Sequence, residues 1–408
     1  MAPATDPTPL PKPIVTDRSH VSSRSLLRRL VSAQESGLVV VIVLMMLALT
    51  VYGALNPKQA RFSVEIPASA SIAQPDPRTL VITDGGTTRT HRSEIDWRIR
   101  GSAGDERSAV GGASVNKFLD KENLVNVTTS ASFIAIMAVG MTAIIILAGI
   151  DLSIGSIYAL AAILGAMVLQ KMPEGASAIL TVPVALLVCG AVGAAAGFIN
   201  GFASVALRVH PFIITLGTMA IYRGLVFVIT GGQTTGAPES IQKGFFKMPA
   251  LGVYPVPTAI MIVVAVVGMV VLSRTVFGRR VYAVGGNEVA ARYAGIPVGF
   301  IKTTVYTLSG MLAGLSACIY LGYYGAAETN AGSGYELNVI AAAVIGGASL
   351  SGGRGSAIGA LLGAILVQLI NNGMVILDIP QAYNQIVMGL AIVLAVVVDQ
   401  TKSRLTGA

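Results

Sequence analysis

Long apolar stretches recur along almost all of this chain, and few charged residues lie between them. Hydrophobic residues make up 53% of its 408 residues and charged residues only 12%, whereas about a quarter of the residues in soluble proteins are charged. A helix needs about 20 mostly apolar residues to cross the hydrocarbon core of a bilayer. The sequence therefore predicts an all-α polytopic membrane protein with about ten transmembrane helices. The predicted spans lie near residues 37–55, 130–150, 154–170, 178–199, 211–230, 256–273, 303–323, 336–350, 356–371 and 384–398.

Small residues are frequent inside these stretches. The chain has 46 glycines, many of them mixed with alanine in the predicted spans. In lipid, helices associate through close backbone packing, which small residues permit. We therefore expect one compact bundle in which helix backbones touch.

The distribution of Lys and Arg predicts which side of the membrane each segment faces, because cytoplasmic loops carry an excess of these residues. With the N-terminus inside, the inner segments are much richer in Lys and Arg than the short outer loops, which hold only Lys171, Lys243 and Lys247. Both termini are then cytoplasmic. Residues 56–127 would be an outer segment although they contain many basic residues; segments longer than about 60 residues largely escape this rule.

The first 36 residues are expected to form a cytoplasmic tail. The tail begins rich in proline, and the apolar residues between Leu26 and Val31 then recur at helical spacing beside Arg24, Arg28 and Arg29. This pattern favours either an interfacial helix that lies on the membrane or an ordinary basic flank. The predicted parts of the chain are the tail 1–36, the first span 37–57, an extracytoplasmic insert 58–116, a transmembrane core 117–400 with an inner loop 274–302, and a cytoplasmic tail 401–408.

Side chains able to perform chemistry are sparse. Cys189 and Cys318 both fall in predicted spans, where a free cysteine behaves as a small buried hydrophobe. His20, His91 and His210 are scattered along the chain. The phosphate-binding pattern G-x-x-x-x-G-K-[ST] does not occur in the sequence. We expect no catalytic residues, no metal, no cofactor, no nucleic-acid partner and no ATP hydrolysis by this chain itself.

The inner loop 274–302 contains a short polar helix. Gly285 and Gly286 are expected to break the chain before it, Asn287 to cap its N-terminus, and Gly295, which precedes a proline by two positions, to end it. Such a helix is either a contact for a soluble partner or a solvated connector.

Several stretches of this chain resemble the permease subunits of ABC importers, specifically the ribose and monosaccharide group of the branched-chain permease superfamily. The resemblance covers roughly residues 117–400 and lies in "AIMAVGMTAIIILAGIDLSIGSIYAL", "FGRRVYAVGGNEVAARYAGI", "GSGYELNVIAAAVIGGASLSGGRG" and "NNGMVIL".

This resemblance implies partners and a location. Two permease copies, as a homodimer, would form the path in the bacterial inner membrane and contact its lipid. An ABC ATPase would dock from the cytoplasm, and a periplasmic or extracellular sugar-binding protein would deliver the substrate. Ribose, other pentoses, hexoses and inositol are all carried by members of this group.

The resemblance also assigns the polar helix of the inner loop as the coupling helix that contacts the ATPase. Glu288, Ala290, Ala291 and Gly295 resemble the E-A-A…G motif of ABC permeases. Its small residues would fit a cleft of the ATPase, while Glu288 and Arg292 would fix the register through charged contacts. Gly285, Gly286 and Asn287 complete the predicted coupling residues.

Polar residues inside the apolar segments are candidates for the substrate path or gate. Asp151 and Ser153 interrupt an apolar run, and an acidic residue there is a functional candidate; the alternative is that Asp151 caps the third span. Asn371 and Asn372 lie late in the ninth span, where they contact either substrate or a neighbouring helix.

Tyr335 and Glu336 come before the eighth span in "GSGYELN". On the predicted topology they lie on the outer side. They are candidates for contact with the binding protein or for lining the entrance.

Two other classes of protein would also be rich in apolar spans. An ion-coupled secondary transporter or channel needs ionisable or polar filter groups within the membrane, and the predicted spans offer few of them. An anchored binding or signalling protein would not need about ten spans.

The insert 58–116 departs from the family, in which a short loop usually joins the first two spans. Its residues 78–100 alternate apolar and polar around an Asp84–Gly85 turn, which predicts a β-hairpin with Trp97 available to seal a small core. We expect a β-rich domain resting on the outer face of the bundle. It is either a contact for the binding protein or partial lid, or an addition without a role in transport.

Overall fold

The computed structural model describes residues 34–101, 107–173, 175–242, 245–248 and 254–406. The basic N-terminal segment that favours an interfacial helix lies outside the described residues. The helices are α2 (Gln34–Leu55), α3 (Lys121–Ile146), α4 (Ile154–Gln170), α5 (Ala178–Leu207), α6 (Pro211–Thr230), α7 (Glu239–Gln242), α8 (Val256–Arg274), α9 (Val276–Gly286), α10 (Glu288–Tyr293), α11 (Val298–Tyr324), α12 (Tyr335–Ile345), α13 (Ala357–Ile376) and α14 (Asn384–Thr406), with short 3-10 turns at Phe245–Lys247 and Gln381–Tyr383. The strands are β1 (Lys58–Ile66), β2 (Ser71–Asp76), β3 (Thr79–Asp84), β4 (Thr87–Arg92), β5 (Arg98–Arg100), β6 (Arg107–Val115), β7 (Thr235–Gly236) and β8 (Ala326–Ala327).

Most of the molecule is a helical bundle of the kind that spans a membrane. Within the described residues, seven helices are long and apolar enough to cross a bilayer: α2, α3, α5, α6, α8, α11 and α13. Three shorter apolar helices, Ile154–Gln170, Tyr335–Ile345 and Gln381–Leu394, lie where the other spans are predicted. The chain is therefore a multi-pass membrane protein.

The predicted span at 336–350 is wrong as a single continuous helix. Helix α12 has 11 residues, Tyr335–Ile345, which corresponds to about 16 Å at 1.5 Å per residue. It ends at Gly346 and Gly347, where the chain turns; a side chain on Gly346 would collide with the carbonyl oxygen of Gly359 at the start of α13. The apolar run continues past this turn, so composition alone overstated the helix.

Backbone contact between α5 and α11 holds the centre of the bundle together. Gly193 and Gly197 on α5 face Gly310 and Gly314 on α11, and a Cβ atom on any of them would collide with backbone atoms of the opposite helix. This close approach confirms the prediction made from the glycine content.

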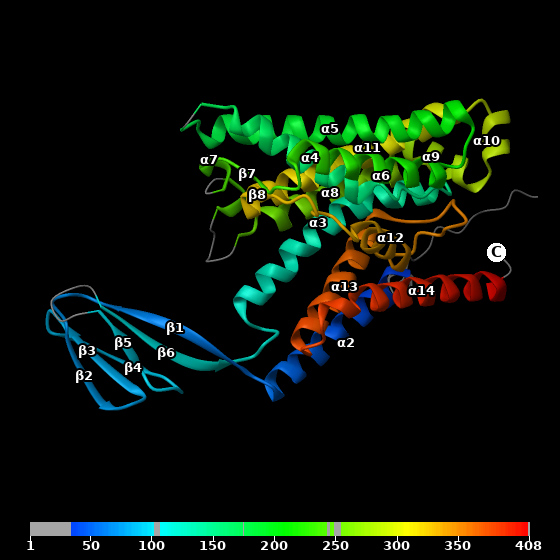
Figure 1. Cartoon of the computed structure of the whole chain (residues 1–408). Helices are drawn as coiled ribbons and strands as arrows, with labels where there is room; N and C mark the ends of the chain where they lie inside the picture. Colours follow the sequence, from blue (N-terminus) through cyan, green and yellow to red (C-terminus); the bar gives the residue numbers. More distant parts are fainter. Residues whose placement is uncertain (1–33, 102–106, 174, 243–244, 249–253, 407–408) are drawn as a thin grey trace, which may run out of the picture.

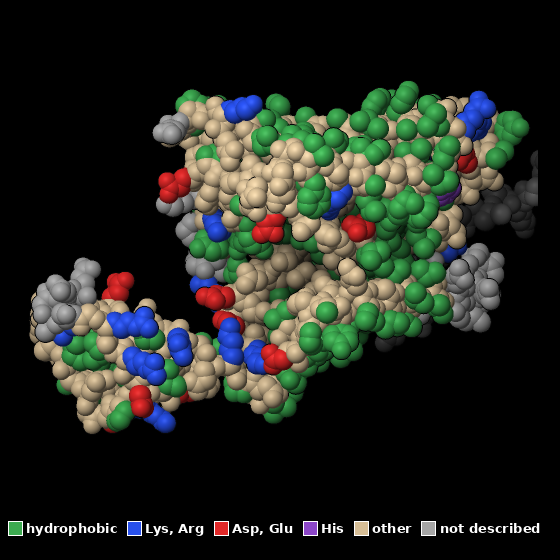
Figure 2. Space-filling model, in the orientation of Figure 1, with side chains coloured by type: hydrophobic (Ala, Val, Ile, Leu, Met, Phe, Trp, Pro, Cys, Tyr) green, Lys and Arg blue, Asp and Glu red, His purple; other side chains and the backbone are tan. Residues whose placement is uncertain are grey.

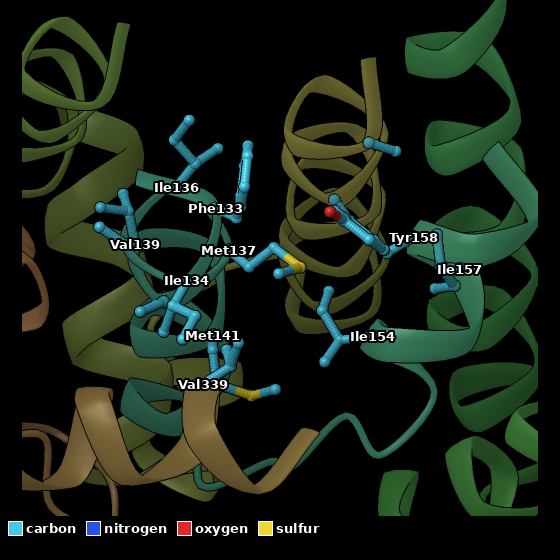
Figure 3. Packing of buried hydrophobic residues seen from close by; sticks show 14 of the residues in the cluster. Phe133, Ile134, Ile136, Met137, Val139, Met141, Ile154, Ile157, Tyr158 and Val339 are labelled. Carbon is cyan, nitrogen blue, oxygen red and sulfur yellow. The ribbon is translucent and has the colours of Figure 1, made fainter. Parts of the chain in front are cut away.

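Helix α3 is enclosed by the other helices. Nearly all of its residues from Ala131 to Ile146 are buried. Figure 3 shows Phe133, Met137 and Met141 of this helix pointing toward α4 and toward Val339 of α12. The core of the bundle therefore lies along α3, which contacts α11 on one side and α12 and α13 on another.

The two ends of the bundle carry different structures. Figure 1 shows α9 and α10 at one end, and α7 with the small β7–β8 pair at the opposite end. Strands β7 and β8 pair through Thr235–Ala327 and Gly236–Ala326. The insert follows α2 at the end away from α10.

The insert contains two three-stranded antiparallel sheets, in the orders β1-β6-β5 and β2-β3-β4. Strands β3 and β4 form the predicted hairpin, with Asp84 opposite Thr87 and with Gly85 and Gly86 at positive φ in the turn. Trp97 is buried, packs edge-on against Phe62 at 5.3 Å between ring centroids, and its indole N–H donates to the carbonyl oxygen of Arg78 at 3.0 Å.

The insert does not rest on the bundle as expected. Figure 1 shows it extending away from the helices beyond the end of α2. Its junction is fixed by Asn116, whose amide donates to the Thr50 carbonyl of α2 and whose side-chain oxygen accepts from the Phe118 N–H. Lys58 also pairs with Asp120 at 2.5 Å. The insert is held at its base and shares little surface with the bundle.

Candidate functional site

The predicted coupling residues lie at the end of the bundle, on α9 and α10. The expectation that Gly285 and Gly286 break the chain is wrong, because α9 runs through both residues. Gly285 instead allows a close approach: a Cβ there would collide with the carbonyl oxygen of Ile146, which also accepts from the Gly353 N–H at 2.8 Å. The break comes at Asn287, whose backbone is extended.

The predicted cap of α10 is confirmed. The side chain of Asn287 accepts a hydrogen bond from the Ala290 N–H at 2.9 Å. Helix α10 ends at Tyr293, and Gly295 follows in the left-handed region at φ 79°. Because only glycine adopts this conformation readily, Gly295 fixes the turn that leads into α11.

Glu288 is engaged by its own chain. Its carboxylate pairs with Arg292 at 3.0 Å and with Lys302 of α11 at 2.6 Å. The hydrogen bond from Lys302 is the main cause that holds the pKa of Glu288 below its usual value. Glu288 therefore positions α10 on α11, while Arg292 remains exposed.

The surface of α10 differs from the expected one. Ala291 is only 5% exposed and faces the chain's own core, so it cannot seat in a separate protein as expected. Ala290 is exposed, and the larger apolar side chains Val289 and Tyr293 are 64% and 89% exposed. Val289 and Tyr293 were not among the predicted coupling residues; their signal was an apolar pair at i, i+4 spacing in the polar inner loop.

A groove of about 800 Å³ runs beside α10. It lies between the α5–α6 turn and the start of α11, and charged and polar side chains from both sides line it. Arg208 and His210 come from the turn, and Glu288, Arg292 and Lys302 from the opposite wall. The groove extends the exposed surface of α10.

Asp151 lies in a buried polar cluster before α4. One of its carboxylate oxygens accepts from the N–H of Ser153 at 2.8 Å and from the hydroxyl of Ser153 at 2.6 Å. That hydroxyl accepts from the amide of Asn200 on α5 at 2.7 Å. Asp151 thus binds the turn before α4 and ties it to α5, but it does not cap the helix as the alternative expects, because the N-cap residue of α4 is Ser153. Its other carboxylate oxygen has no partner among the described residues.

Arg223 of α6 holds the segment that leads into α12. Its guanidinium donates to the carbonyl oxygens of Thr329 at 2.8 Å and Ala331 at 2.9 Å. Residues 328–334 are thereby fastened to the bundle with Gly332 against Gly155 of α4. Arg223 was not among the predicted site residues, although an arginine in an apolar span is itself a signal of function.

Tyr335 and Glu336 lie between helices. The ring of Tyr335 packs against buried Tyr158 of α4 at 5.4 Å between centroids, and Glu336 lies beside Gly155. These contacts favour lining the entrance over contact with a separate binding protein.

A row of aromatic rings continues from Tyr158. Tyr320 lies 5.5 Å from Tyr158, and Tyr324 lies 5.0 Å from Tyr320, measured between ring centroids. The hydroxyl of Tyr158 is buried without a partner among the described residues. The row links α12, α4 and α11, and it ends at Tyr324, which is exposed.

Asn372 makes an interhelical contact. Its amide donates to Asn123 of α3 at 2.6 Å, and the amide of Asn123 donates back at 3.2 Å. This reciprocal pair joins α13 to α3, which is the second of the two roles expected for Asn372. The side-chain oxygen of Asn371 is buried with no partner among the described residues.

Nothing in the described residues suggests metal or thiol chemistry. No group of three or more His, Cys, Asp or Glu side chains there could hold a metal ion. Cys189 and Cys318 are both free and buried, which confirms their interpretation as small core residues.

Residues 123–396 match the sequence family described as branched-chain amino acid transport system / permease component. The chain is 42% identical over 289 residues to the ribose import permease protein RbsC of Escherichia coli (strain K12), covering 70% of this chain and 88% of that protein. It is 39% identical over 292 residues to the ribose import permease protein RbsC of Bacillus subtilis (strain 168), covering 70% and 87%. It is 37% identical over 295 residues to the D-allose transport system permease protein AlsC of Escherichia coli (strain K12), covering 72% and 88%. No solved structure matches the chain.

Proposed function

Because this chain belongs to the permease component family of branched-chain amino acid transport systems, we propose that it is the membrane subunit of an ATP-driven importer for ribose or a related monosaccharide. It is a transport component and not an enzyme. The observation that carries the sugar assignment is the 42% identity to a ribose import permease over 289 residues. The family match covers residues 123–396, which hold the bundle apart from α2, and it begins after the insert.

The proposed topology has ten crossings. Seven are the long apolar helices, and α4, α14 and α12 with the segment before it supply the other three. Both termini would face the cytoplasm of a bacterial cell, with α9 and α10 at the inner surface. This orientation is supported by the basic residues of the inner loop 274–302, since Lys and Arg favour the cytoplasmic side.

The exposed surface of α10 would contact the ATPase. Tyr293 and Val289 project from a helix that a side-chain cap, a glycine turn and the Glu288–Lys302 pair hold in place. Large exposed apolar side chains on a fixed helix suit a protein contact. Arg292 would add a charged contact at its edge.

Two further partners follow from this function. An extracytoplasmic sugar-binding protein would deliver the substrate to the end that carries β7–β8, and a second copy of the chain would complete the path. The insert 58–116 would project on the same outer side. It would offer that binding protein an additional contact or a partial lid; the alternative is that the insert has no role in transport.

Reconstitution tests the function. The chain would be placed in proteoliposomes with its ATPase and its sugar-binding protein, and uptake of radiolabelled D-ribose would be measured. We expect uptake only when ATP is present on the ATPase side, and none with a non-hydrolysable analogue. Uptake driven by an ion gradient without ATP would show a secondary transporter instead.

A further inference from the structure

A small pocket lies where α12 begins. It has a volume of about 180 Å³ and lies between the first turn of α12 and the start of α14. Five of its lining side chains are uncharged and able to form hydrogen bonds: Ser333, Asn338, Gln381, Asn384 and Gln385. A glycine, a leucine and a methionine complete the lining. Such a concentration of amides is unusual in a bundle in which apolar side chains predominate.

The polar groups of this pocket are not used by the fold. None of the five side chains forms a hydrogen bond with another described residue, and the side-chain oxygen of Asn384 is buried without a partner. Buried polar groups normally have partners, so an unpartnered one calls for an unseen water or ligand. The pocket therefore offers one buried unsatisfied acceptor, that of Asn384, beside polar side chains that no described residue engages.

The position of the pocket is fixed by the irregular segment before α12. Gly334 ends this segment in the left-handed region at φ 79°, and α12 starts at Tyr335. Arg223 holds the segment through the carbonyl oxygens of Thr329 and Ala331. Within a membrane, irregular backbone occurs where it is buried in protein or lines a cavity. In many transporters the substrate site forms at such an interruption of a helix. Figure 2 shows a hollow on the side of the molecule that faces the viewer, between the helices at the top (α4, α5, α6 and α11 in Figure 1) and those at the bottom (α2, α13 and α14).

From these observations we infer that the amide pocket, Ser333, Asn338, Gln381, Asn384 and Gln385, binds a small uncharged polyhydroxylated ligand, a monosaccharide ring, on its way across the membrane. This inference rests on the proposed function. Each amide presents both a donor and an acceptor, as each sugar hydroxyl does. The lining holds no charged residue, which suits a neutral ligand. Since a water occupies about 30 Å³ in the liquid, the volume of about 180 Å³ accommodates one small ring.

Thiol labelling in the complete complex tests the pocket. The native cysteines are buried, so a Ser333→Cys variant carries an accessible thiol at the pocket. Labelling by a polar maleimide is measured in proteoliposomes with the ATPase and binding protein, with and without D-ribose. We expect D-ribose to slow labelling of this variant several-fold. Asn126→Cys, at an exposed position on α3 outside the pocket, is the matched control and should label at the same rate with and without sugar.

A second pair of variants removes the hydrogen-bonding groups. Asn338→Leu with Asn384→Leu, introduced into the Ser333→Cys chain, should abolish the protection by D-ribose and lower ATP-driven uptake, whereas Asn126→Leu should retain both. Co-purification of the ATPase checks assembly. Protection that is absent from a complex that still imports D-ribose, or that is equal at position 126, overturns the pocket assignment. Failure of the unmodified complex to import any sugar would instead overturn the proposed function.

Discussion

Gly155 in the first turn of α4 and Gly332 in the segment before α12 touch through their backbones. A side-chain carbon on Gly155 would collide with the carbonyl oxygen of Gly332, and one on Gly332 would lie 2.6 Å from the carbonyl oxygen of Gly155. Residues 177 positions apart in the chain thus set the position of the segment that leads to α12 and to the amide pocket.

Substitution of Gly332 should displace this segment. Gly332 combines the close contact with a positive φ of 68°, so Gly332→Ala should lower uptake and thermal stability through both effects. Gly231→Ala is the matched control, since its φ is also positive but no atom lies within 4 Å of an added Cβ. Uptake and unfolding temperature should fall clearly further for Gly332→Ala. Equal losses in the two variants would show that backbone conformation, and not the contact with Gly155, decides the effect.

Arg223 should be needed to hold residues 328–334, the segment before α12, in place. Arg223→Leu removes the donors to Thr329 and Ala331, and hydrogen bonds from a charged group contribute about 1.5–3 kcal/mol. We expect a lower unfolding temperature and faster proteolysis near residues 325–334. Arg223→Lys should recover only part of the loss, because an ammonium cannot reproduce the planar fork of a guanidinium. A wild-type proteolysis pattern in Arg223→Leu would contradict this role.

The two faces of α10 should respond differently to mutation. Tyr293→Ala removes an exposed side chain, so we expect weaker co-purification of the ATPase with unchanged stability of the isolated chain. Ala291→Trp overfills a position that is 5% exposed and should lower the stability of the isolated chain itself. Normal co-purification of the ATPase with Tyr293→Ala would remove the proposed contact surface.

Two substitutions of Asp151 distinguish a structural role from a role in the substrate path. Asparagine keeps the side-chain oxygen that accepts from the N–H and hydroxyl of Ser153, so Asp151→Asn should retain most uptake. Asp151→Ala leaves these donors and the Asn200 connection without support, and we expect it to lower stability by about 1–3 kcal/mol. Strong loss of uptake in Asp151→Asn, with normal expression and ATPase binding, would instead indicate a role of the charge in the path.

Deletion of the insert should be tolerated if its base is kept. Asn116 binds α2 and the chain before α3, so residue 57 should be joined to residue 116 by a short polar linker. We expect this variant to insert and to bind the ATPase normally, and to lose affinity for the binding protein. Unchanged affinity and unchanged uptake would show that the insert has no role in transport.

Local sequence patterns accounted for much of the fold. The apolar stretches located the helices, the Asp84–Gly85 turn located the hairpin of the insert, and Asn287 at the start of the polar helix predicted the cap that accepts from the Ala290 N–H. Each of these features depends on residues close together in the chain. The same reasoning failed at Gly285, because what decides that position is the carbonyl oxygen of Ile146.

The sequence by itself determined that this is a multi-pass helical membrane protein. Its apolar stretches are long and contain so few charged residues that the helices suit a lipid bilayer and not water. Only the tertiary structure decided that α12 is short, that Arg223 fastens the segment before it, and that Ala291 is buried while Tyr293 is exposed. It also brought residues 333–338 together with residues 381–385 to form the amide pocket. The physical reason is that helix formation in lipid follows from composition over about 20 residues, whereas depth, burial and hydrogen-bond partners depend on contacts between segments far apart in the chain.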